Sequence, residues 1–151
     1  MRAVVQRVSD AAVTVDGDMV SEIGIGLLAL IGVEPDDGLA DAAALASKLV
    51  GLRIFADAGG KMNRSVQDVG GGVLVVSQFT LLGDMRKGRR PSFAGAAPPE
   101  VARTLVDQVA DRIRETGVPC ATGVFGARME VRLTNDGPVT LVLDVKDGRL
   151  L

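Results

Sequence analysis

The segment 27–33 (Leu-Leu-Ala-Leu-Ile-Gly-Val) restricts the possible folds more than any other part of the sequence. It is continuously apolar and has the length of a strand, without the polar alternation of a half-solvated strand. A strand of this kind is buried on both faces, so it lies in the middle of a sheet that needs cover on each side. Residues 73–79, which follow three glycines at 70–72, form a second apolar strand candidate.

Two amphipathic segments are predicted to supply that cover. A helix is expected to begin near Leu39, after a cap at Asp36 or Asp37. A second helix is expected to begin at Pro98-Pro99, where proline is tolerated, and to stop at Gly117. The apolar positions of the two helices recur at three- and four-residue spacing: Ala42, Leu45, Ala46, Leu49 and Leu52, and then Val101, Leu105, Val109 and Ile113.

Further strands are predicted at the start of the chain. Residues 2–9 and 11–15 are expected to form two short strands, with a turn at Asp16-Gly17 and a returning strand at residues 19–23. Near the end, residues 129–133 and 139–145 alternate apolar with polar side chains around Asn135-Asp136-Gly137-Pro138. This pattern predicts a hairpin.

Many strands and two helices, with no internal repeat and no low-complexity linker, predict an α+β fold. We expect a single domain over residues 1–151, with a largely antiparallel or mixed, barrel-like β-sheet covered by two α-helices. A chain of this length is long enough to bury one sizeable core.

The composition excludes several kinds of chemistry. The sequence has no histidine and one cysteine, Cys120, so it lacks the residues for a zinc finger, a Ser-His-Asp triad, a Cys-His pair or an internal disulfide. We predict no metal and no cofactor, and the lone thiol favours a reducing, cytoplasmic compartment. The apolar run 24–33 is about half of the roughly 20 residues that a bilayer span needs, so no membrane segment is expected. The net charge of -2 provides no overall basic field for a nucleic acid.

Residues 24–29 (Gly-Ile-Gly-Leu-Leu-Ala) match the spacing of a dinucleotide-binding fingerprint. That fingerprint follows a strand and opens a helix, whereas these glycines lead into a predicted strand. We therefore favour the interpretation that the glycines relieve a tight turn or a crowded sheet.

A basic cluster occupies residues 86–90, where four of five side chains are cationic: Arg86, Lys87, Arg89 and Arg90. Such a patch on a loop can neutralise several nucleic-acid phosphates. A solvated basic loop accounts for it equally well. Phe93 follows shortly after and places an aromatic ring beside the charges.

Gly137-Pro138 by itself is a common turn sequence, but the residues around it are more specific. Residues 135–140 (Asn-Asp-Gly-Pro-Val-Thr) and residues 77–80 (Ser-Gln-Phe-Thr) together resemble the two signatures of the D-aminoacyl-tRNA deacylase, or D-tyrosyl-tRNA(Tyr) deacylase, family. The resemblance continues through residues 5–8, 53–55, 61–63, 90–93 and 122–125 and thus spans essentially the whole chain.

The resemblance implies an editing hydrolase that cleaves the ester bond of D-aminoacyl-tRNA, and of mischarged glycyl-tRNA, and rejects L-aminoacyl-tRNA. This activity is translation quality control by chiral proofreading in the cytoplasm. In this family the protein is a homodimer with active sites at the subunit interface, where it binds the 3′ acceptor end of tRNA. The Gly-Pro peptide bond is cis, and its carbonyl groups form a backbone filter that the other subunit supplies; Gly137 and Pro138 are the matching residues.

The resemblance also implies roles for other residues. The chemistry is placed at Phe79 and Thr80, where main-chain amides would stabilise a tetrahedral oxyanion. Thr80 is expected to position the substrate rather than to act as nucleophile, because no histidine activates its hydroxyl. Ser77 and Gln78 either contact the substrate or shape the strand end.

Three further groups complete the expected site. Phe125 would pack near the terminal adenine, with core packing as the alternative, and Arg7 would hold the Gly-Pro segment in orientation. The basic cluster at 86–90 would contact acceptor-stem phosphates. Two other functions remain open at this point: a non-catalytic RNA- or ligand-binding dimer, in which Gly137-Pro138 is only a turn, and a peptidyl-tRNA hydrolase.

Overall fold

The computed structural model of the chain describes residues 1–151 and is built around one seven-stranded sheet. The path of paired strands is β7-β6-β3-β1-β8-β9, and β2 pairs with β1. Strand β3 runs parallel to β6, and β6 runs parallel to β7, whereas β1 is antiparallel to β2, β3 and β8. The sheet is therefore mixed, as predicted. The bounds of its strands are β1 Arg2–Val15, β2 Asp18–Ile23, β3 Gly26–Gly32, β6 Gly72–Ser77, β7 Cys120–Thr122, β8 Glu130–Lys146 and β9 Arg149–Leu150.

Strand β3 lies in the middle of the sheet, as its apolar sequence predicted. Its side chains alternate between two hydrophobic clusters: Leu27 and Ile31 face the larger cluster, and Leu28 faces the smaller one. Glycine at position 26 permits a close contact between strands, since a Cβ atom there would lie 1.8 Å from the carbonyl oxygen of Gly72. Gly26 thus serves a crowded sheet, whereas nothing lies within 4 Å of a Cβ added at Gly24, and both glycines lead into a strand rather than a helix.

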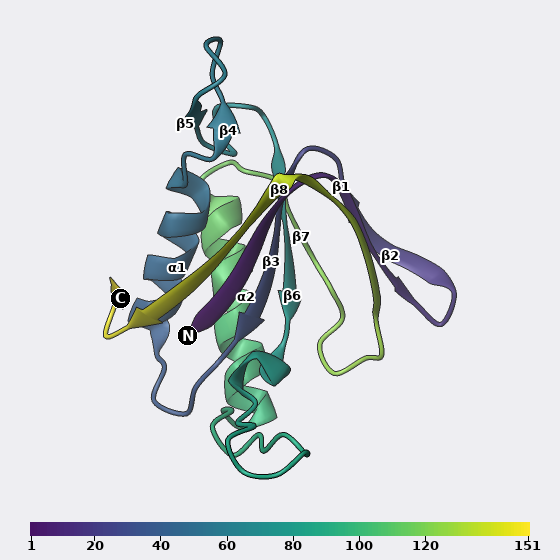
Figure 1. The fold of residues 1–151 in the computed structure, drawn as a ribbon, viewed down its shortest axis with the longest axis vertical. Coiled ribbons are helices and arrows are strands. Elements are labelled where there is room, and N and C mark those ends of the chain that lie inside the picture. The colour runs from purple at the N-terminus through teal and green to yellow at the C-terminus, as the bar shows by residue number, and fades with distance from the viewer.

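Helices α1 (Leu39–Gly51) and α2 (Pro99–Glu115) cover one face of the sheet and pack on each other (Figure 1). Their buried side chains join β1, β3 and β6 in the larger cluster of 26 residues. The outer halves of β1 and β8, with β2, curl over the other face, where Val15, Ile23 and Val131 pack against the smaller cluster. The prediction of an α+β fold with a barrel-like sheet and two covering helices is confirmed.

The predicted cap of α1 is wrong. The N-cap residue is Gly38 and not Asp36 or Asp37, and the Asp41 carboxylate accepts hydrogen bonds from the Gly38 and Gly148 amides at 2.8 and 2.9 Å. Burial tends to raise the pKa of Asp41, but these hydrogen bonds outweigh it and hold the pKa below its ordinary value. Asp41 thereby ties the start of α1 to the β8-β9 turn.

The predicted hairpin around Gly137-Pro138 is also wrong. Residues on both sides of it belong to the single strand β8, and both halves pair antiparallel with β1, for example Leu133 with Ala11 and Leu143 with Ala3. The chain therefore bends at this point and does not reverse. Residues 2–9 and 11–15 likewise form one strand, whose register with β8 shifts between Gln6 and Asp10. Both long strands bend together, at the apex labelled β8 in Figure 1.

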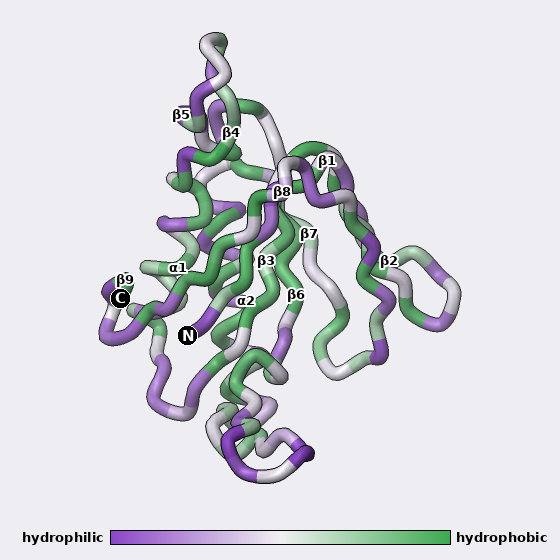
Figure 2. The backbone as a smooth tube through the Cα atoms, viewed as in Figure 1, coloured by the Kyte–Doolittle hydropathy of each residue, from purple (hydrophilic) through white to green (hydrophobic).

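The remaining elements lie outside this sheet. Strands β4 (Phe55–Ala56) and β5 (Met62–Arg64) form a small antiparallel pair, and the 3₁₀ turn η1 spans Phe79–Leu82. Figure 2 shows apolar sequence concentrated along β3 and β6 and hydrophilic sequence in the loop beyond η1. No helix combines the length and the apolar character needed to cross a bilayer.

Candidate active site

The Ser-Gln-Phe-Thr motif lies where β6 ends. The strand stops at Ser77, two residues before the predicted limit, because Phe79 and Thr80 turn into η1. The Gln78 amide donates a hydrogen bond to the Ile31 carbonyl at 2.7 Å, and its side-chain Nε2 donates to Thr80 Oγ1. These contacts fix the Thr80 hydroxyl on an exposed turn beside the end of β3.

A cavity of about 500 Å³ opens beside this motif. It brings together three of the predicted site residues, Ser77, Phe79 and Phe125, but neither Gln78 nor Thr80 lines it. Nine of its 13 lining residues are hydrophobic, which suits a flat, weakly polar group such as a nucleic-acid base. The lining residues are Ile31, Val33, Ser77, Phe79, Phe93, Ala96, Ala97, Pro98, Pro99, Ala102, Val106, Phe125 and Gly126.

Aromatic rings shape the cavity. Phe79 is 56% exposed and meets Phe93 edge-on, with ring centroids 5.0 Å apart. Phe125 lies between β7 and β8, and the guanidinium carbon of Arg103 stands 4.9 Å from its ring centroid. The sequence indicates Phe93 as a ring beside basic residues and as part of the resemblance at 90–93, but assigns it no role, and Arg103 belongs to no motif that singles it out.

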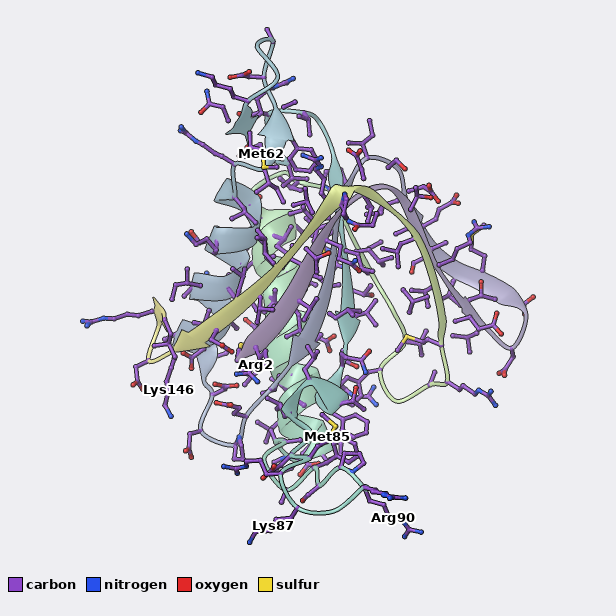
Figure 3. The ribbon with its side chains drawn as sticks, viewed as in Figure 1. Arg2, Met62, Met85, Lys87, Arg90 and Lys146 are labelled. Atoms are coloured by element: carbon purple, nitrogen blue, oxygen red, sulfur yellow. The ribbon has the colours of Figure 1, made fainter.

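The basic loop lies at the same end of the molecule as η1, where Figure 3 shows Lys87 and Arg90 pointing outward. Backbone hydrogen bonds between Asp84 and Ser92, 2.8 and 2.9 Å long, close the loop at its base. Arg86 forms an ion pair with Asp84 at 2.7 Å, and this contact holds the pKa of Asp84 below its ordinary value. Three cations therefore remain unpaired on this loop: Lys87, Arg89 and Arg90.

The Gly137-Pro138 peptide bond is cis and lies at the bend of β8. Arg7 holds this bend: its Nε donates to the Asp136 carbonyl at 3.0 Å, and its Nη1 donates to the Ile54 carbonyl at 2.5 Å. The Arg7 side chain is only 13% exposed. Asn135 adds a cross-link, because its Nδ2 donates to the carbonyls of both Arg7 and Val139.

The two signature motifs lie at opposite ends of the sheet. Arg7, at the bend, pairs with Leu27, whereas Ser77 pairs with Ile31, four residues further along β3. At about 3.3 Å per residue this separates them by roughly 13 Å along the strands. They are also three strands apart, since the order is β6-β3-β1-β8. Within one chain, therefore, the two motifs do not converge on a single aminoacyl group.

Comparison with known proteins decides the family. The family model described as D-Tyr-tRNA(Tyr) deacylase matches residues 4–144. The chain belongs to this family. It is 60% identical over 144 residues to a D-aminoacyl-tRNA deacylase of Syntrophobacter fumaroxidans, a match that covers 95% of this chain and 97% of that protein. It is 62% identical over 149 residues to a D-aminoacyl-tRNA deacylase of Thermomicrobium roseum, with 99% and 97% covered.

Two solved structures share the fold of this chain. The c-Myc DNA Unwinding Element Binding Protein superposes with a TM-score of 0.89 at 41% identity, over 95% of this chain and 98% of that one. A probable eukaryotic D-amino acid tRNA deacylase superposes with a TM-score of 0.78 at 20% identity, over 93% and 97%, and shares the fold.

The side chains of this family member offer few nucleophiles. Burial raises the pKa of the Cys120 thiol to about 11, so the thiolate is scarce at neutral pH. The sequence has no histidine, and the only partner of the Thr80 hydroxyl is the Gln78 amide, which is not a base. Neither Cys120 nor Thr80 is therefore activated as a nucleophile.

Proposed function

We propose that this chain is a D-aminoacyl-tRNA deacylase, which hydrolyses the ester between a D-amino acid, or glycine, and the 3′ end of tRNA in the cytoplasm. Membership of the family supports the activity. The main support for a site shared between two copies is the separation of the two signature motifs within one chain. A homodimer in which each copy supplies one motif to the other would bring them together.

In this proposal the terminal nucleotide of the tRNA enters the cavity. Its adenine packs against Phe125, where an aromatic contact with a base is worth about 1–3 kcal/mol. The aminoacyl ester then extends toward Ser77 and η1, at the end of β6. The unpaired cations of the basic loop would contact acceptor-stem phosphates beyond the cavity.

The reaction is the addition of water to the ester carbonyl. The carbonyl oxygen becomes an oxyanion, and the amides of Phe79 and Thr80 would stabilise it, because amides at the start of a helical turn lack partners within the turn. The bond to the ribose oxygen then breaks; that oxygen takes up a proton, and the attacking water has lost one. Thr80 and Gln78 would position the substrate, and the ribose 2′-hydroxyl would help to activate the water.

Selectivity would come from Gly137 and Pro138 of a second copy. Their carbonyl oxygens would accept hydrogen bonds from the substrate α-amino group and leave no room for an L side chain. Such a filter requires a rigid bend, which Arg7 and Asn135 provide through four hydrogen bonds to carbonyl groups. Because selection is by exclusion, varied D side chains would be accepted, and glycine would not be rejected.

Incubation of the protein with D-tyrosyl-tRNA, L-tyrosyl-tRNA and glycyl-tRNA tests this function. The expected result is rapid release of D-tyrosine and glycine. L-Tyrosyl-tRNA should be hydrolysed no faster with the protein than in buffer alone. If no ester is released faster than in buffer, the protein is a binding module and the proposal fails. Equal release of D- and L-tyrosine would refute the filter, and release only from N-acetylated substrate would indicate a peptidyl-tRNA hydrolase.

A further inference from the structure

Arg103 lies on the first turns of α2, between Ala102 and Val106 in sequence; these two residues line the cavity, and Arg103 is beside it. Its guanidinium carbon is 4.9 Å from the ring centroid of Phe125, which lines the same cavity. The N-terminal end of α2 lies beside η1 at this end of the fold (Figure 1). A contact of this kind is worth about 0.5–1 kcal/mol at an exposed site, and it favours this position of the guanidinium over others.

Arg103 differs from the other arginines of α2 in having no carboxylate partner. Arg112 pairs with Glu115 at 3.5 Å, and Arg114 pairs with Asp111 at 2.8 Å. Glu100 and Asp107 stand three and four residues from Arg103, the spacing that favours helix ion pairs, yet neither forms one with it. The donors of the guanidinium are therefore all available to a ligand.

A guanidinium above an aromatic ring keeps its N–H groups directed outward in its own plane, where they match the oxygens of a phosphate. Because Arg103 contacts the Phe125 ring, a nucleotide whose base packs against that ring would lie beside the guanidinium, with its own 5′ phosphate within reach. None of the 13 residues that line the cavity is charged. Arg103 is thus the cation best placed to meet that phosphate.

We propose that Arg103 is a binding residue for the phosphate on the 5′ side of the terminal nucleotide, and that it acts together with Phe125 as one recognition unit for that nucleotide. The inference rests on the proposed function and adds a specific contact to it. In this arrangement the basic loop contacts phosphates further along the RNA, whereas Arg103 binds the phosphate on the 5′ side of the terminal nucleotide.

Paired model substrates isolate this contact: the D-tyrosyl esters of adenosine and of adenosine 5′-monophosphate differ by one phosphate. A charge-assisted hydrogen bond is worth about 1.5–3 kcal/mol, so the wild type is expected to favour the monophosphate ester about tenfold or more in kcat/KM, chiefly through KM. Arg103→Ala and Arg103→Gln are expected to reduce this preference to less than about twofold. Arg112→Ala removes the same charge from the same helix and is the matched control, with the preference unchanged.

The same variants are measured on D-tyrosyl-tRNA at several salt concentrations. Arg103→Ala is expected to raise KM about tenfold at low salt, to leave kcat unchanged, and to reduce the slope of log KM against log salt by about 0.7–0.9, the value for one phosphate contact. An equal loss on both model esters would mean that Arg103 only supports the Phe125 ring, and would overturn the inference. The inference would also be overturned if the wild type cleaves D-tyrosyl-tRNA and Arg103→Ala changes neither KM nor the salt slope. A wild type that cleaves no D-aminoacyl ester would instead overturn the proposed function.

Discussion

Replacing Gly137 with alanine tests the requirement for a rigid backbone bend. Gly137 has a φ of +145°, a region that L side chains avoid, at a cost of about 1–2 kcal/mol. A Cβ atom there would lie 2.7 Å from the Val139 nitrogen and 3.2 Å from Arg7 Nη2. Ordinary contact begins at 3.4 Å, so the backbone has to move by 0.7 Å (3.4 minus 2.7) at the point where the filter is proposed to act.

A displacement of this size in a positioning group costs up to about a hundredfold in rate. We expect Gly137→Ala to lower kcat/KM on D-tyrosyl-tRNA at least about tenfold, to reduce the preference for the D over the L ester, and to lower Tm by about 2–8 °C. Single-turnover deacylation of the two esters and thermal unfolding measure these effects. Gly17→Ala is the matched control, because Gly17 also has a positive φ, +87°, but nothing lies within 4 Å of its added Cβ. A folded Gly137→Ala protein with wild-type rate and stereoselectivity would show that the bend at Gly137 is not the filter.

Three further predictions concern the reaction centre, the RNA contact and stability. Thr80→Ala is expected to retain appreciable single-turnover deacylation, because main-chain groups carry the chemistry; a folded but inactive variant would restore a nucleophilic role for the hydroxyl. Lys87→Ala is expected to lower the salt dependence of KM by about one phosphate contact, whereas Arg86→Ala, which removes a cation already paired with Asp84, is expected to change it less; equal slopes for both variants would contradict this. Asp41→Asn is expected to destabilise the fold by about 2 kcal/mol near pH 7 in denaturant titrations. The pKa of Asp41 is lower in the folded state than its ordinary value of 3.8. The stability difference between the wild type and Asp41→Asn should therefore be complete above about pH 5 and be lost as the pH falls below 3.8 and through the folded-state pKa. A stability difference that does not change with pH would exclude the carboxylate as its source.

The parts of the fold that the sequence predicted are those fixed by local pattern. The apolar segment 27–33 indicated the central strand, and the periodicity after Leu39 and after Pro98-Pro99 indicated both helices. The bend of β8 was not predictable in this way, because alternating strands on both sides of a Gly-Pro pair describe a reversal and a bend equally well. Pairing with β1 decides between them, and that pairing joins residues more than 100 positions apart.

The candidate site also has a part that the sequence predicted from a local motif and a part that depends on packing. The Ser-Gln-Phe-Thr motif is contiguous, so its place at a strand end could be predicted. Phe125, which the resemblance placed near the terminal adenine, lines the same cavity as Ser77 and Phe79, and its contact with adenine stays a prediction. The wall formed by residues 96–99 and Ala102 could not be predicted, since it depends on how α2 packs against the sheet. Arg103 is a single arginine on an exposed helix face, and two features of the folded structure distinguish it from the other arginines of α2: its contact with the Phe125 ring and its lack of a carboxylate partner.

Mixed dimers test whether one copy supplies the reaction half of each site and another copy supplies the filter. One chain carries Gly137→Ala, and the other carries Ala102→Trp, which fills the cavity. If the halves come from different copies, each mixed dimer contains one site with both halves intact and one site with both defects. Deacylation of D-tyrosyl-tRNA by purified mixed dimers should then recover to about half of the wild-type rate per dimer. A rate no higher than the mean of the two parent variants would show that each chain builds its own complete site and would contradict the account.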